Sequence, residues 1–202
     1  MSANAGSSHH GGAVAAEATC TGIPSAKLGM WLFLVSEIML FTGLLGAYIV
    51  LRAGLPSWPA PGENLKISLA ALNTFVLLSS SLTMALGVAA VGRKDLSRLR
   101  LFLAVTILLG LAFLGVKGLE YSEKFHHGHV PGSGIFWDCY FTLTGFHGLH
   151  VLVGVLANLW VLSLTFGRDF LEDRGHVVEI SGLYWHFVDV VWIFLFPLLY
   201  LI

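Results

Sequence analysis

The stretch ISLAALNTFVLLSSSLTMALGVAAV, residues 67–91, decides the fold class because it runs for 25 residues without a charged side chain. A helix needs about 20 apolar residues to cross the roughly 30 Å hydrocarbon core of a bilayer. A strand of a membrane barrel needs only about 9–11 residues of alternating character. The stretch therefore predicts a transmembrane α-helix.

Four further apolar runs accompany this stretch, one before it and three after it. Each run contains at most a few ionisable groups. The five predicted spans cover residues 28–51, 67–91, 99–121, 138–166 and 180–202. A helix satisfies its own backbone hydrogen bonds inside lipid. The sequence thus predicts an all-α integral membrane protein, with a five-transmembrane-helix bundle over residues 27–202.

The composition supports a membrane protein and excludes several other classes. Hydrophobic residues make up 56% of the 202 residues and charged residues 11%, whereas soluble domains carry about 25% charged residues. The 12 acidic and 11 basic residues nearly cancel, so no charged tail indicates a nucleic-acid partner. Cys20 and Cys139 lie far apart in unlike surroundings. They indicate neither a disulfide framework nor a zinc site.

Residues 1–26 are rich in Gly, Ala, Ser and His and are predicted to form a flexible tail. Glu17 precedes the first apolar run and no basic segment leads into that run, so the tail is not predicted to be a signal peptide. Short connections are predicted between the spans. They cover residues 52–66, 92–100, 122–137 and 167–179.

Positive charges predict the orientation, because cytoplasmic loops carry an excess of Lys and Arg. One face of the membrane holds seven: Lys27, Arg93, Lys94, Arg98, Arg100, Arg168 and Arg174. The other face holds four: Arg52, Lys66, Lys117 and Lys124. This bias predicts a cytoplasmic N-terminus and an external C-terminus.

Ionisable groups inside the spans are costly in lipid and mark specific contacts or pathways. The candidates are Glu37, Glu120, His147, His150, His186 and Asp189. Haem or metal ligation by the histidines is one interpretation, but ligation needs several imidazoles that converge. A proton path is a second, although no repeat typical of transporters is visible. Hydrogen bonding between helices is the third, and the residues alone favour it most.

Two spacings bear on how the helices meet. His147 and His150 are three residues apart, which predicts that they share one helical face. Gly145, Gly148 and Gly154 are predicted to let a neighbouring helix approach closely.

Four motifs resemble subunit III of the haem–copper oxidases, the cytochrome c oxidase family. Residues 27–43, KLGMWLFLVSEIMLFTG, resemble the family's glutamate-bearing helix. Residues 141–154, FTLTGFHGLHVLVG, are similar to its TGFHGLHV segment, and residues 184–196, YWHFVDVVWIFLF, to its terminal helix. Residues 118–121, GLEY, match its acidic-Tyr element. The four motifs follow the family order from about residue 27 to 202.

This resemblance implies a five-helix bacterial form of a subunit that has seven helices in mitochondria. It implies a chain without catalytic, cofactor-binding or metal-binding residues, with haem and copper in partner subunits I and II. The family role is to stabilise subunit I and to support its proton uptake. The resemblance also implies membrane lipids as partners, allows bound phospholipid and a respiratory supercomplex with cytochrome c, and places the chain in the bacterial inner (cytoplasmic) membrane.

Carried over by position, Glu37 is the family's buried helix carboxylate and Glu120 its second acid. His147, His150, His186 and Asp189 form its packing network. Glu37 lies about 15 Å into its span by helical rise and should be protonated or hydrogen-bonded. The candidate partners are His147, His150, Trp185, a lipid headgroup or subunit I.

Other functions remain open from the sequence. The same subunit occurs in quinol oxidases, and a related accessory protein serves nitric oxide reduction. In this family subunit II binds the electron donor. The sequence of this chain therefore does not indicate whether the donor is cytochrome c or a quinol. A proton-coupled transporter is a more remote alternative, distinguished by the absence of a twelve-helix haem–copper partner.

Overall fold

The computed structural model of the protein describes residues 24–56, 58, 65–167 and 170–201. Its helices are α1 (Ser25–Gly54), α3 (Ile67–Gly92), α4 (Leu96–His126), α5 (Ile135–Leu164), the short α6 (Phe170–Asp173) and α7 (Gly175–Tyr200). All except α6 are long and apolar enough to cross a membrane. The predicted all-helical fold with five spans is confirmed.

The helices continue beyond the apolar runs from which their spans were predicted. A helix keeps its backbone hydrogen bonds where it leaves the hydrocarbon, so counting apolar residues misses its polar ends. The predicted basic loop 92–100 is wrong, since only residues 93–95 join α3 to α4. Asp95 caps α4 by accepting a 3.1 Å hydrogen bond from the backbone N–H of Arg98.

Similar shifts occur at the other ends. The predicted loop 167–179 contains α6 and the first residues of α7. The predicted loop 122–137 shortens because α4 continues to His126 and α5 begins at Ile135. Of the predicted tail, residues 1–23 lie outside the described residues, and α1 already begins at Ser25.

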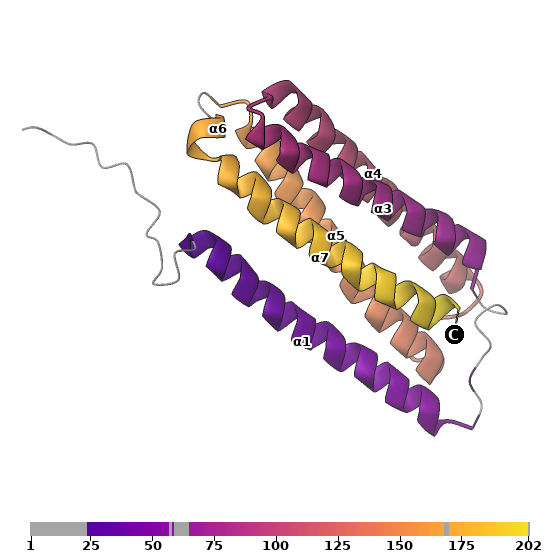
Figure 1. Ribbon diagram of the computed structural model, residues 1–202. Helices are drawn as coiled ribbons and strands as arrows, with labels where there is room; N and C mark the ends of the chain where they lie inside the picture. The colour runs from indigo at the N-terminus through magenta and orange to yellow at the C-terminus, as the bar shows by residue number, and fades with distance from the viewer. Residues whose placement is uncertain (1–23, 57, 59–64, 168–169, 202) are drawn as a thin grey trace, which may run out of the picture.

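Four of the helices form a packed bundle, and α1 lies along its side (Figure 1). In the bundle α3 packs against α4 and α7, and α5 packs against α4 and α7. α1 rests mainly on α7 and touches α5 less. Among the five spans α1 is the least buried and α7 the most buried. We call the end with α6 and the start of α1 the α6 end, and the opposite end the C-terminal end.

Trp185 of α7 is the centre of the packing. Its side chain is fully buried between two glycines of neighbouring helices, Gly110 of α4 and Gly154 of α5. A Cβ atom at Gly110 would lie 2.7 Å from Trp185 Cη2, and one at Gly154 would lie 2.8 Å from Cε3. These two positions therefore require glycine for the helices to approach the indole.

The predicted glycine face is only partly right. Gly154 makes the close approach, but a Cβ at Gly148 would meet no atom within 4 Å, and one at Gly145 would meet only the Tyr121 hydroxyl at 3.8 Å. Gly110 was missed because Gly is common in membrane helices and its spacing alone does not mark a contact.

Candidate functional site

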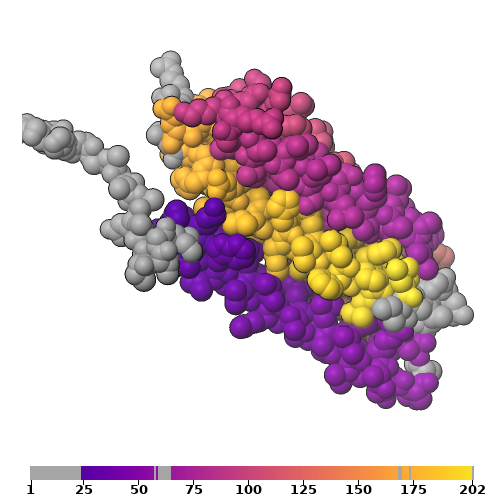
Figure 2. Space-filling view, viewed as in Figure 1, coloured from indigo at the N-terminus to yellow at the C-terminus, as the bar shows by residue number. Residues whose placement is uncertain are grey.

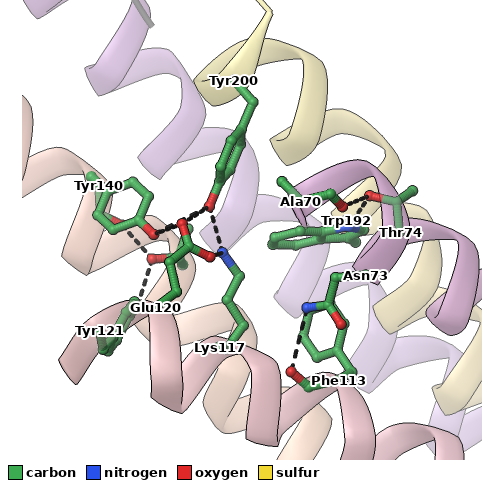
Figure 3. A network of polar contacts seen from close by, with 11 residues as sticks. Ala70, Asn73, Thr74, Phe113, Lys117, Glu120, Tyr121, Tyr140, Trp192 and Tyr200 are labelled. Carbon is green, nitrogen blue, oxygen red and sulfur yellow. Dashed lines mark hydrogen bonds and ion pairs between the residues drawn. The ribbon is translucent and has the colours of Figure 1, made fainter. Parts of the chain in front are cut away.

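A buried polar network, shown in Figure 3, includes Tyr200 at the C-terminal end of α7. At its centre, Lys117 Nζ is 3.0 Å from Glu120 Oε2, one turn along α4. Both side chains are less than one-tenth exposed. Tyr140 of α5 and Tyr200 of α7 donate hydrogen bonds of 2.7 and 2.9 Å to Glu120 Oε1. Three helices thus meet at one carboxylate.

The Lys117 ammonium group is compensated on several sides. It donates to the Tyr200 hydroxyl as well as to Glu120. It also lies over the ring of Trp192 at 4.8 Å and over that of Tyr140 at 5.6 Å from the ring centres. A buried ion pair is tolerated when further hydrogen bonds and favourable ring faces offset its desolvation. This arrangement meets that condition.

Further contacts extend the network to α3. The Trp192 indole N–H donates to Thr74 Oγ1 at 2.9 Å, and the Asn73 amide donates to the Phe113 carbonyl at 3.3 Å. On the other side, a hydrogen bond joins the hydroxyls of Tyr121 and Thr144. The network therefore links α3, α4, α5 and α7, the four helices of the bundle.

Of this network, the sequence singles out only Glu120. Lys117 is predicted among the charges of the external face, whereas the structure buries Lys117 inside the bundle. Removing Lys117 from the four external charges leaves three. The spacing of Lys117 and Glu120, three residues apart on one helix, was the available signal. Nothing in the sequence marks Tyr140 and Tyr200 as their partners.

A second polar contact joins α1 to α5 near the middle of the bundle. Glu37 Oε2 lies 3.0 Å from His150 Nε2, and both side chains are mostly buried. The other ring nitrogen, Nδ1, is 2.7 Å from the Phe146 carbonyl, so both nitrogens of His150 have partners. Of the partners suggested for Glu37, the structure selects His150.

His147 and His150, which are predicted to share one helical face, have different partners. His147 points into the bundle, where its ring stacks on Trp192 at 4.9 Å, while His150 reaches Glu37 on α1. Both nitrogens of His147 are buried without a hydrogen bond. In the described part of the chain, no three His, Cys, Asp or Glu side chains come together as a metal site.

The remaining candidates lie on α7 and face α3. The Trp185 indole N–H donates to Ser80 Oγ at 3.1 Å. His186 Nδ1 is 2.7 Å from Ser81 Oγ. Asp189 is buried, and neither of its oxygens has a hydrogen bond of good geometry. The candidates therefore divide into three groups. Glu120 belongs to the buried polar network, Glu37 and His150 form the contact between α1 and α5, and Trp185, His186 and Asp189 lie where α7 packs against α3.

Residues 9–202 match the family model described as cytochrome c oxidase subunit III. The chain belongs to this family. A Synechocystis protein named cytochrome c oxidase subunit 3 is 40% identical over 184 residues, which are 90% of this chain and 78% of that protein. Its Thermostichus vulcanus counterpart is 36% identical over 87% of this chain and 86% of its own length. A Bacillus subtilis protein named quinol oxidase subunit 3 is 36% identical over 86% of this chain and 85% of its own length.

Membership of the subunit III family makes this chain a multi-pass membrane protein and one subunit of an oxidase complex. Other oxidase subunits are therefore its partners. The four motifs that carried the resemblance all lie within the matched residues. They include Glu37, Glu120 and the candidates of α5 and α7.

The contact between Glu37 and His150 gives the first prediction for this subunit III. We expect Glu37→Gln to leave assembly and turnover of the oxidase nearly unchanged, because the glutamine amide supplies both a donor and an acceptor to His150 Nε2. The expected loss of stability is below about 1 kcal/mol. Subunit content and oxygen consumption of the purified complex measure both effects. Complete loss of turnover would instead identify Glu37 as an essential proton carrier.

Proposed function

We propose that this chain is the non-catalytic subunit III of a proton-pumping haem–copper terminal oxidase that reduces oxygen to water in an aerobic respiratory chain. It binds subunit I, with subunit II in the same complex, stabilises subunit I during turnover and supports its proton uptake. The single observation that carries this proposal is the family match over residues 9–202.

The use of the polar side chains supports a structural role. Glu120, Lys117, Glu37 and His150 are engaged with one another or with other groups of this chain. Such contacts hold helices together where lipid provides no hydrophobic drive for association. In this proposal, haem and copper reside in the partner subunits. Metal analysis and the Soret absorbance of the isolated subunit test this, and a stoichiometric metal or haem would contradict it.

The electron donor is proposed to be cytochrome c. The Synechocystis relative at 40% identity and the Thermostichus vulcanus relative at 36% are both named as subunits of cytochrome c oxidases. The quinol oxidase subunit of Bacillus subtilis, also at 36%, supports quinol as the second candidate. Turnover assays of the purified complex with reduced cytochrome c and with a quinol separate the two.

The orientation proposed is a cytoplasmic α6 end in a bacterial inner membrane. After the buried Lys117 is removed from the count, the sequence carries seven positive charges on the face predicted to be cytoplasmic and three on the other face. The corrected count strengthens the bias towards a cytoplasmic N-terminus. Membrane lipids are proposed to cover the many apolar side chains on the outside of the helices.

Depletion of the subunit tests the stabilising role. We expect an oxidase purified without this chain to begin turnover at a substantial rate and then to lose activity irreversibly, with slower proton uptake at high pH. The physical reason is that subunit I loses a packing partner at one face. The measurement is oxygen consumption over time, with the complex reconstituted with the subunit as the control. Turnover that stays linear for as long as in the intact complex would contradict the role.

A further inference from the structure

Asp189 is a buried acid that neither the polar network nor the Glu37–His150 contact uses. It lies half-way along α7 and is 3% exposed. None of the ion pairs among the described residues involves it. An uncompensated carboxylate at this depth is strongly disfavoured. The group is therefore held as a neutral acid that carries one proton.

The Ser81 hydroxyl of α3 connects Asp189 to a histidine. It is 2.7 Å from His186 Nδ1 and lies near the Asp189 carboxyl, although neither carboxyl oxygen has a hydrogen bond of good geometry. His186 precedes Asp189 by three residues, so the two side chains lie within one turn on the α3-facing side of α7. Asp189, Ser81 and His186 thus lie next to one another, with a hydrogen bond between Ser81 and His186 and none of good geometry between Ser81 and Asp189.

A groove leads from His186 to the α6 end. It has a volume of about 300 Å³ and is lined by Lys27 of α1, residues of α3, and Glu179, Gly182 and His186 of α7. Figure 2 shows the surface of α7 between those of α3 and α1. Glu179 and His186 are seven residues apart, so the groove extends about 10 Å along the helix. Its mouth holds the Lys27–Glu179 ion pair, 3.0 Å long and nearly half exposed.

We propose that Asp189 is a proton-binding site in exchange with the aqueous phase at the α6 end through this groove, His186 and Ser81. Asp189 first releases its proton by the reverse route, through Ser81 Oγ to His186 Nδ1, while His186 Nε2 gives its proton to water in the groove. A proton from that water then binds His186 Nε2. The Nδ1 proton passes to Ser81 Oγ, and the Ser81 proton passes to the Asp189 carboxylate. One proton is transferred, and His186 is left neutral as the other tautomer. Among the described residues that line the groove, the charged or titratable groups are His186 and the Lys27–Glu179 pair.

Infrared spectroscopy of the intact oxidase complex tests the proposal. A protonated carboxyl has a carbonyl stretch that a carboxylate lacks, and this band shifts when the proton is replaced by deuterium. We expect Asp189→Asn to remove one such band. In the unaltered complex the band should shift promptly in D₂O, and His186→Phe should slow that shift about a hundredfold, the low end of what a positioned acid–base group contributes to proton transfer.

Two matched controls separate the relay from packing effects. His176→Phe makes the same change at an exposed position of α7, and Ser79→Ala removes an exposed hydroxyl of α3 that bonds only to its own helix. Neither should alter the exchange, whereas Ser81→Ala should slow it even if His186→Phe prevents assembly. A missing Asp189 band, or exchange that is unchanged in Ser81→Ala, would overturn the proposal. The measurement is made without turnover, so its outcome is separate from that of the depletion experiment.

Discussion

Replacing Lys117 with methionine should cost the subunit about 3–5 kcal/mol of stability, because removal of one partner of a buried ion pair leaves the other charge uncompensated. Methionine fills a similar volume but leaves Glu120 with only the hydroxyls of Tyr140 and Tyr200. The midpoint of subunit release from the purified complex in a denaturing-detergent titration measures this loss. We expect the double variant Lys117→Met with Glu120→Gln to recover most of it, since no charge then remains buried.

The chain offers a matched surface pair as the control. Lys66 Nζ lies 2.6 Å from Glu123 Oε1, with the two side chains 59% and 39% exposed. Exposed ion pairs contribute about 0–1 kcal/mol, so Lys66→Met should have a small effect. If Lys117→Met cost no more than Lys66→Met, the network would not hold the bundle together.

The second large effect is expected where Trp185 lies between two glycines. A methyl group at Gly110 or Gly154 would enter the space of a rigid, fully buried indole, at 2.7 and 2.8 Å from its carbon atoms. Overpacking of this kind costs about 1–3 kcal/mol. We therefore expect Gly110→Ala and Gly154→Ala to destabilise the subunit, as measured in the same detergent titration.

Each of these variants has a control on its own helix. A Cβ at Gly115 of α4 or at Gly148 of α5 meets no atom within 4 Å. Alanine is preferred to glycine inside a helix by about 0.5–1 kcal/mol, so these controls should be neutral or slightly stabilising. Alanine at Gly110 or Gly154 should thus lower the stability of the subunit, whereas alanine at Gly115 or Gly148 should leave it unchanged or raise it slightly. Equal changes at all four glycines would show that Trp185 can move aside.

The sequence predicts how deep a residue lies in the membrane far better than which neighbour it faces. Counting apolar residues located all five spans. A helix in water shows its buried side as an apolar stripe, but in lipid the outer side is apolar as well. Nothing therefore indicated that His147 turns to Trp192 while His150 turns to Glu37.

The candidate site shows the same limit. Glu120 was recognised because a carboxyl inside a span is rare, and Glu37 because it is the sole charge of its run. Their partners come from helices distant in sequence, as Tyr200 does for Glu120. The register of packed helices decides such pairs, and this register depends on contacts such as those of Trp185 with Gly110 and Gly154.

The contact that holds α1 to the side of the bundle joins two residues that are synthesised far apart in time. Glu37 enters the bilayer early in synthesis, but His150 follows it by 113 residues. At about 5–20 residues per second, the ribosome needs roughly 6–23 s to deliver this partner. During that interval the first helix carries a carboxyl in the membrane without its native contact. The nascent helix can enter the membrane with Glu37 as the neutral acid, and the contact with His150 forms only after α5 has been synthesised.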